Sequence, residues 1–111
     1  MIWTIVGQSD SYPTLTRKEI STDYTVLPGD FILEVDATGA ACLVTLPDAT
    51  EKAGRTILIK RMNSGANAVT VDPLGSQEIE ASGASVVIDA QFKWIWLWSN
   101  GAQWLKMGSS L

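Results

Sequence analysis

The chain has 111 residues, of which 46% are hydrophobic and 18% charged, so we expect one folded domain and exclude a disordered chain. Its net charge is −4 and its basic residues are scattered, which argues against a nucleic acid or an anionic membrane as the partner. The sequence contains no histidine, which removes Ser-His-Asp and Cys-His catalysis and ordinary zinc sites, and we expect no enzyme, no cofactor and no metal site.

The first 21 residues differ from the rest and predict an N-terminal arm. Residues 2–6 are apolar and predict one short strand, and a polar, turn-prone linker follows them. Such an arm has little to bury in its own domain, so we expect it either to be disordered or to pair with a neighbouring chain by strand addition. Residues 1–21 are therefore interpreted as an arm, and residues 22–111 as the folded domain.

From residue 22 onward the hydrophobic pattern has a period of two, which is typical of strands. Turn residues interrupt the pattern at intervals of about ten residues, the spacing of an all-β sandwich or barrel. The segments that predict strands are residues 31–36, 42–46, 56–61, 68–72 and 85–88, with weaker candidates at 24–27 and 77–80. We therefore expect an all-β fold, a small antiparallel β-sandwich or jelly-roll-like domain.

One helical turn is expected over residues 47–54, between two of these strands. Asp48 and Glu51 have the spacing of a capping box, in which two side chains satisfy the free N–H groups at the start of a helix. Gly54 is well placed to end that turn in a left-handed conformation.

The last two strands are predicted to form a hairpin. Residues 92–98 lead to Asn100–Gly101, the preferred centre of a type I′ turn, and residues 102–107 follow. A two-residue loop at this point places Leu97 opposite Trp104.

The strand over residues 92–98 is apolar on both faces, with four aromatic side chains on one face and Lys93, Ile95 and Leu97 on the other. A strand that is polar on neither face is expected to be covered on both. One face can fill the domain core, and the other is expected to meet a second subunit. The expected interface residues are Phe92, Trp94, Ile95, Trp96 and Leu97. A tryptophan-rich core with some exposed rings and a sugar-stacking platform remain as alternatives.

Few residues suggest chemistry. Glu78 and Glu80 share a strand face, as the paired carboxylates of a glycosidase would, but acids at this spacing are more often a solvated edge. The one cysteine, Cys42, lies in an apolar run and predicts a small buried side chain rather than a catalytic thiol. The turns at residues 36–39 and 72–75 begin with aspartate but lack the ligand density of a calcium loop.

An ordered series of short motifs resembles a small β-module of tailed-bacteriophage virion proteins and covers residues 22–107. The matching segments are Tyr24-Thr25-Val26-Leu27, residues 31–38, 44–49, 54–60 and 67–73, Ile79 and residues 98–104. Such modules sit in tail fibres, spikes and other surface appendages and are typically trimeric. The resemblance therefore implies a homotrimeric β-structure on a phage particle.

Two functions follow from this resemblance. Fibre proteins carry a longer attachment domain ahead of the module than the 21 residues found here, so we favour a trimeric capsid decoration (cement) protein on the outer head surface. Its partner would be the major capsid protein or another virion protein. The N-terminal arm, residues 1–21, would be the anchor to the particle, with Ile2, Trp3, Ile5 and Tyr12 as the expected contacts. The protein would be located in the virion after synthesis in the host cytoplasm. The alternative is a receptor-binding module of a tail fibre or baseplate, in which Trp98 and Trp104 stack on host glycans.

Overall fold

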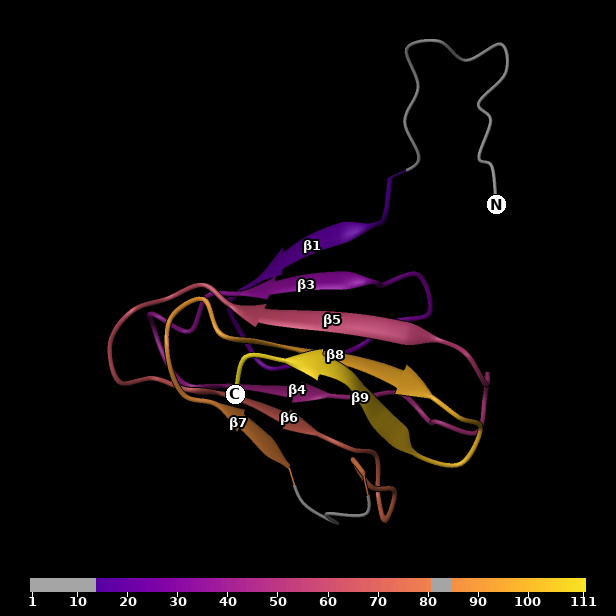
Figure 1. Ribbon diagram of the computed structural model, residues 1–111. Helices are drawn as coiled ribbons and strands as arrows, with labels where there is room; N and C mark the ends of the chain where they lie inside the picture. The colour runs from indigo at the N-terminus through magenta and orange to yellow at the C-terminus, as the bar shows by residue number, and fades with distance from the viewer. Residues whose placement is uncertain (1–13, 81–84) are drawn as a thin grey trace, which may run out of the picture.

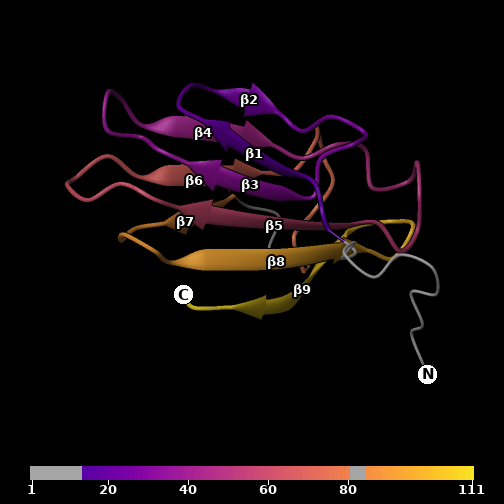
Figure 2. The ribbon, with the colours of Figure 1, turned by 90° about the horizontal axis from the view of Figure 1, so that it is seen from above.

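The structure is a computed structural model that describes residues 14–80 and 85–111, and within these ranges it contains nine strands and no helix. The predicted all-β fold is confirmed. Two sheets pack face to face in a sandwich-like arrangement (Figures 1 and 2): sheet A has the order β1-β3-β5-β8-β9, and sheet B the order β2-β4-β6-β7. The strands are β1 (Arg17–Ile20), β2 (Tyr24–Thr25), β3 (Ile32–Val35), β4 (Cys42–Thr45), β5 (Thr56–Arg61), β6 (Val69–Asp72), β7 (Val86–Ile88), β8 (Trp94–Ser99) and β9 (Trp104–Ser109).

Strands β1 to β6 alternate between the two sheets, and this alternation makes neighbouring strands within each sheet parallel. In sheet A, β1 pairs with β3 and β3 with β5, while in sheet B β2 pairs with β4 and β4 with β6. The chain is thus a flattened coil whose turns each give one strand to each sheet. The antiparallel pairs begin only after β6, with β6–β7, β5–β8 and β8–β9.

The expectation of an antiparallel sandwich is therefore wrong, because both sheets are mixed. A hydrophobic period of two shows which side chains share a face of a strand, but it does not show which strands are neighbours. A strand followed in sequence by one in the opposite sheet finds its partner one turn later, with the same direction. The jelly-roll-like strand order is not confirmed.

The domain begins earlier than expected, because β1 belongs to sheet A. The expected arm includes residues 17–20, whereas in the structure they pair in register with β3, from Arg17 with Ile32 to Ile20 with Val35. Charged side chains are common on edge strands, and here they obscured the strand pattern.

The core lies between the sheets and consists of inward-facing side chains at alternate positions. Leu33, Ile59 and Ile95 are register partners on β3, β5 and β8, and all three are completely buried. Cys42 on β4 is buried as predicted, and burial raises the pKa of its thiol.

Residues 47–54 form tight turns instead of the expected helical turn. The Asp48 side chain accepts hydrogen bonds from the backbone N–H (2.9 Å) and the hydroxyl (2.7 Å) of Thr50, and these contacts, with a bond from Gln77, lower the pKa of its carboxyl. The turn does not continue as a helix, because the backbone N–H of Gly54 donates to the carbonyl of Ser99 (2.7 Å) and not to the carbonyl four residues before it. The left-handed conformation predicted for Gly54 is confirmed by its φ of 89°.

The hairpin between β8 and β9 is confirmed, but its loop is longer than predicted. Ser99 pairs with Trp104, so the loop comprises residues 100–103. Within it, the side-chain oxygen of Asn100 accepts hydrogen bonds from the backbone N–H groups two and three residues ahead, both at 2.9 Å. The predicted pairing of Leu97 with Trp104 is therefore wrong.

Candidate interaction surfaces

The outer face of sheet A is apolar over much of β3, β5, β8 and β9 and carries charged side chains on β1, β3 and β5. No second layer of described residues covers it, since sheet B packs on its other side (Figure 2). One row of register partners crosses it from Ile32 on β3 through Leu58 on β5 to Trp96 on β8. The side chains of this face are only partly buried. We call it the tryptophan face and define it by Ile32, Leu58, Trp94, Trp96, Trp98 and Leu105.

A shallow hollow of about 220 Å³ lies on the tryptophan face, lined by Leu58, Lys60, Trp94 and Trp96. A Cβ atom at Gly108 would lie 3.3 Å from the Trp94 ring, so the missing side chain allows this ring to lie against β9. The indole N–H of Trp96 is buried and donates no hydrogen bond. Two indole rings and an aliphatic side chain thus form the walls of a surface depression.

Phe92, in the turn before β8, is an exposed aromatic residue with an unfavourable backbone conformation. Its φ is 65° and 53% of the residue is exposed. A bulky side chain rarely adopts this left-handed region, which costs about 1–2 kcal/mol. Its ring lies 5.7 Å from the ammonium of Lys60, beside the hollow. The backbone N–H of Phe92 donates to the carbonyl of Arg61 (2.7 Å), and the N–H of Arg61 donates to the carbonyl of Lys93 (3.0 Å), so the turn is held against the end of β5.

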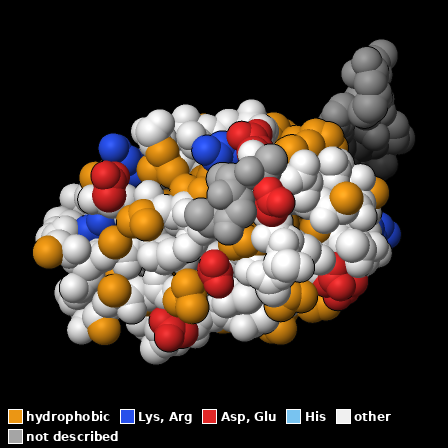
Figure 3. Space-filling view, turned by 90° about the horizontal axis from the view of Figure 1, so that it is seen from below, with side chains coloured by type: hydrophobic (Ala, Val, Ile, Leu, Met, Phe, Trp, Pro, Cys, Tyr) orange, Lys and Arg blue, Asp and Glu red, His pale blue; other side chains and the backbone are white. Residues whose placement is uncertain are grey.

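The outer face of sheet B is different in character. Its central side chains are Thr45, Thr70 and Asp72, and exposed apolar residues such as Leu43 and Val87 flank them singly. In the view from below, hydrophobic side chains lie in small separate groups among polar and acidic ones (Figure 3). The concentration of aromatic side chains is therefore a property of sheet A.

The structure separates the residues predicted for the subunit interface into two groups. Trp94 and Trp96 belong to the tryptophan face, and Phe92 is exposed in the turn beside it. Ile95 and Leu97 are completely buried in the core against sheet B, so they are not available to a second subunit.

The two residues predicted to contact a glycan are also separated. Trp98 lies on the tryptophan face, partly buried between Thr56 and Leu105. Trp104 is completely buried, and its indole N–H donates a hydrogen bond to the carbonyl of Pro47 (3.2 Å). Its ring is a core element and is not accessible to a sugar. The predicted anchor contacts Ile2, Trp3, Ile5 and Tyr12 lie outside the described residues.

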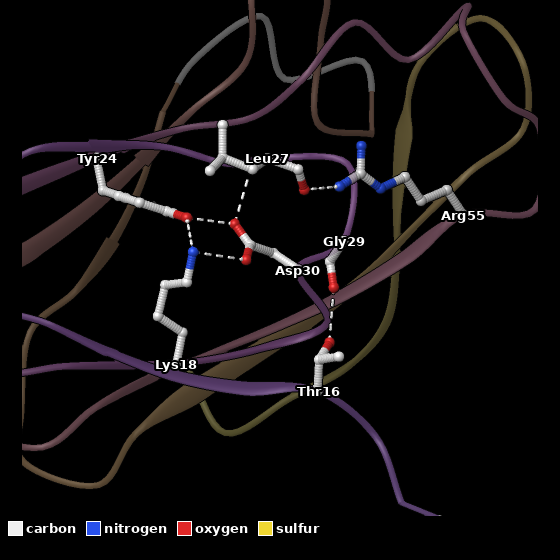
Figure 4. Close-up of polar contacts among 7 residues, drawn as sticks. All are labelled: Thr16, Lys18, Tyr24, Leu27, Gly29, Asp30 and Arg55. Carbon is white, nitrogen blue, oxygen red and sulfur yellow. Dashed lines mark hydrogen bonds and ion pairs between the residues drawn. The ribbon is translucent and has the colours of Figure 1, made fainter.

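A polar network that sequence reasoning missed closes the sandwich beside β1 (Figure 4). Lys18 faces inward from β1, and its ammonium contacts the hydroxyl of Tyr24 (2.7 Å) and the carboxylate of Asp30 (3.2 Å). Asp30 also accepts hydrogen bonds from Tyr24 and from the backbone N–H of Leu27. The three side chains come from separate segments, and no spacing or motif in the sequence joins them.

The electrostatics of this network indicate a structural role. Burial disfavours the charged form of Asp30, but the hydrogen bonds from Tyr24, Leu27 and Lys18 outweigh burial and lower the pKa of its carboxyl. The bond to Tyr24 is the main reason that the pKa of Lys18 is raised. Burial raises the pKa of the Tyr24 phenol, so the network does not produce an activated phenolate. An inward-facing charge at an edge strand also hinders pairing with another chain.

Glu78 and Glu80 cover part of the outer edge of β9. The backbone N–H of Trp104 donates to the carbonyl of Glu78 (3.0 Å), and the carboxylate of Glu80 accepts from the backbone N–H of Lys106 (2.9 Å). In the described ranges, no group of three or more Cys, Asp and Glu side chains is arranged to hold a metal ion. The same ranges contain no helix that is long and apolar enough to cross a membrane.

Comparison of the sequence with protein-family models and with curated proteins finds no match. The resemblance to phage virion modules therefore stays a prediction from the residues alone.

Proposed function

We propose that this chain is a structural protein of a bacteriophage virion, a homotrimeric decoration protein on the outer surface of the head. The observation that carries the proposal is the tryptophan face. Its aromatic side chains are partly exposed and lie side by side on one face, whereas apolar side chains scattered singly over a surface need no partner. Aromatic side chains are also enriched at protein interfaces.

The charges around the tryptophan face support contact between copies of this chain. At the β1–β3 side, Glu19 and Glu34 share the guanidinium of Arg17 as their partner. On β5, Lys60 is the register partner of Glu34, yet its ammonium lies over the Phe92 ring and forms no ion pair within the described residues. The β1–β3 side of the face is thus acidic, and the central strand β5 carries a cation without a carboxylate partner among the described residues. In a head-to-tail ring the acidic side of one copy can pair with this cation of the next.

Anchoring to the particle is assigned to residues that precede β1. Since residues 17–20 belong to sheet A, the proposed anchor is shorter than the predicted arm and ends before Arg17. Its contacts remain Ile2, Trp3, Ile5 and Tyr12, and its partner the major capsid protein or another virion protein. Binding at many lattice sites would stabilise the assembled head, because a ligand of the assembled state favours that state.

The oligomeric state is tested by sedimentation equilibrium with two matched variants. Phe92 and Val87 are similarly exposed, at 53% and 50%, but Phe92 lies beside the tryptophan face of sheet A, whereas Val87 lies on β7 of sheet B. Phe92→Ser should weaken the trimer, while Val87→Ser should leave it unchanged. Phe92→Gly removes the backbone strain, so it should preserve the fold and still weaken assembly. A wild-type monomer at micromolar concentration would contradict the proposed trimer.

The location is tested by immunogold electron microscopy of intact phage particles with an antibody against this protein. Gold distributed over the heads supports a decoration protein. Gold confined to tail tips favours the alternative function, and no gold on any particle removes the virion assignment.

The alternative is a receptor-binding module of a tail fibre or baseplate. It is favoured by the hollow between Trp94 and Trp96, because aromatic rings can stack on sugar rings there. Trp98 lies on the same face, whereas the buried Trp104 no longer belongs to this hypothesis. Binding to a glycan array that is lost in a folded Trp98→Ala variant would support this function. No binding at multivalent density would count against it.

A further inference from the structure

A groove runs across the end of the sandwich where the parallel strands β1, β3 and β5 begin, to the right in Figure 1. It consists of two adjoining hollows of about 610 and 300 Å³, which share Thr16, Gly29, Asp30 and Phe31. This size is within the range of ligand pockets in proteins, about 300–1,000 Å³. The groove does not include any residue of the tryptophan face except Ile32 at its border.

Basic residues are concentrated in this groove although the protein as a whole is acidic. Four of the eight basic residues of the chain line it: Arg17, Lys18, Lys52 and Arg55. Arg17 is paired with Glu19 and Glu34, and Lys18 with Asp30.

The remaining two cations have no acidic partner. Lys52 is exposed and forms no ion pair with any described residue. Arg55 donates to the backbone carbonyl of Leu27 (Figure 4) and likewise has no carboxylate beside it in the described part of the chain. Asp30 is the one acid in the described lining, and Lys18 already compensates its charge. The groove therefore has an excess of positive charge.

Apolar side chains stand beside these cations. Leu15 and Leu27 are 59% and 50% exposed, and Pro28 and Phe31 complete an apolar part of the lining. A ligand that fits such a lining combines carboxylates with apolar side chains. The guanidinium of an arginine suits a carboxylate because its planar N–H groups match the two oxygens.

We propose that this groove binds an acidic, partly apolar segment of polypeptide, supplied by the virion protein on which the trimer sits. The identity of that partner rests on the proposed function, whereas the preference for an acidic peptide rests on the groove alone. Thr14, Leu15 and Thr16 line the groove and are the last residues of the proposed anchor, so both would contact the same partner surface.

The test measures fluorescence anisotropy of a labelled peptide of alternating glutamate and leucine, titrated with the full chain at low and at physiological salt. A glutamine–leucine peptide is the uncharged control. We expect the acidic peptide to bind and the glutamine–leucine peptide not to bind. The affinity for the acidic peptide should fall as the salt concentration rises, because salt screens exposed charges. Lys52→Glu should weaken binding about fivefold or more, since it replaces an attractive exposed charge with a repulsive one. Lys52→Arg should keep the affinity.

Lys106→Glu is the matched control, because it makes the same charge change at an exposed position on β9, outside the groove. Equal weakening by Lys52→Glu and Lys106→Glu would show attraction to the whole protein and overturn the site. Equal affinity for the two peptides would also overturn it. Binding of heparin but not of the acidic peptide would replace the proposed ligand with an anionic polysaccharide.

A further competitor is a second copy of this chain, since Glu19, Glu34 and Asp36 line a hollow at the opposite end of the same strands. Salt-sensitive self-association that Lys52→Glu abolishes in the absence of peptide would overturn the proposal in favour of end-to-end stacking. If the peptide result holds while immunogold finds no protein on phage particles, the groove stands and the proposed function fails.

Discussion

Replacement of Trp104 tests whether this residue packs in the core, as the structure shows, or contacts a glycan at the surface, as the sequence suggested. The indole is completely buried, so its burial removes roughly 200 Å² from water. At about 25 cal/mol per Å² this contributes roughly 5 kcal/mol, an upper value because the unfolded chain already buries part of its surface. Trp104→Ala should therefore destabilise the domain by about 3–5 kcal/mol, the usual range for a buried tryptophan.

The measurement is urea unfolding followed by circular dichroism. With an m-value of about 2 kcal/mol per M, a loss of this size lowers the midpoint by about 2 M. Domains are typically stable by about 5–15 kcal/mol, so Trp104→Phe provides a milder variant that should still fold. It keeps most of the packing but leaves the Pro47 carbonyl without its donor, at a cost of about 1–3 kcal/mol.

Trp98→Ala is the internal comparison, because Trp98 lies on the outer face of the adjacent strand and is only partly buried. It should cost less than half as much as Trp104→Ala. Equal midpoint shifts for the two alanine variants, or no loss in Trp104→Phe, would refute the placement of Trp104 inside the sandwich.

Three further predictions concern stability. The pKa of Asp30 is lowered in the folded state, so its ionised carboxyl stabilises the fold above pH 3.8, and this stabilisation is lost as the pH falls through the folded pKa. The pKa of Lys18 is raised, so its ammonium stabilises the fold below pH 10.5, and this stabilisation is lost as the pH rises through the folded pKa. Thermal melts across pH should show both losses, and Asp30→Asn should reduce the acidic one; an unchanged acid profile would contradict it. Gly54→Ala should destabilise the domain by about 1 kcal/mol through backbone strain alone, because the φ of Gly54 is 89° and no atom lies within 4 Å of the added Cβ. A urea midpoint equal to that of the wild type would argue against the left-handed conformation of Gly54. Arg61 is buried and donates hydrogen bonds to the carbonyls of Gly65 and Ile88. Arg61→Lys lacks the planar guanidinium that makes both bonds, so it should lower the free energy of unfolding by about 1–3 kcal/mol in the same urea assay. An unchanged midpoint would refute this.

The sequence predicted the strands better than their partners. Residues 56–61 coincide with β5, and residues 42–46 and 68–72 each contain a strand of the structure. These segments alternate in hydrophobicity, so the pattern shows both the strand and its buried face. Strand direction depends on which sheet the next segment joins, and turn residues alone do not determine that.

Turn chemistry explains two smaller errors. The aspartate–glutamate spacing at residues 48–51 suggested a helix start, but the turn closed by the Glu51 N–H and the Asp48 carbonyl (3.2 Å) is not continued, because the N–H of Gly54 donates to Ser99 on β8 (2.7 Å). The Asn100–Gly101 pair suggested a two-residue loop, but Asn100 uses its side-chain oxygen as an acceptor and holds a longer loop. In the first place a carbonyl on another strand competes for the N–H group, and in the second a side chain does.

The candidate sites were predictable only where one strand carries them. Trp94, Trp96 and Trp98 alternate along β8, so their common face could be inferred directly. Lys52 and Arg55 reach the groove from the loop before β5 and meet a segment that precedes β1. Contacts of this kind depend on how the coil stacks its turns, which a single sequence does not reveal.

The alternation of β1 to β6 between the sheets has a consequence for how the protein folds and opens. Strand partners in the parallel part are 15 and 26 positions apart along sheet A, and every connection between them passes through sheet B. Neither sheet can form by itself, because the chain has to pass through a strand of the other sheet before it adds the next parallel strand. The β8–β9 hairpin is the most local pairing in sheet A, and the remaining pairs require closure of long loops, which favours folding in milliseconds to seconds. Slow hydrogen exchange should accordingly extend over β3, β4, β5 and β6 as one cooperative unit, with no sheet opening independently of the other.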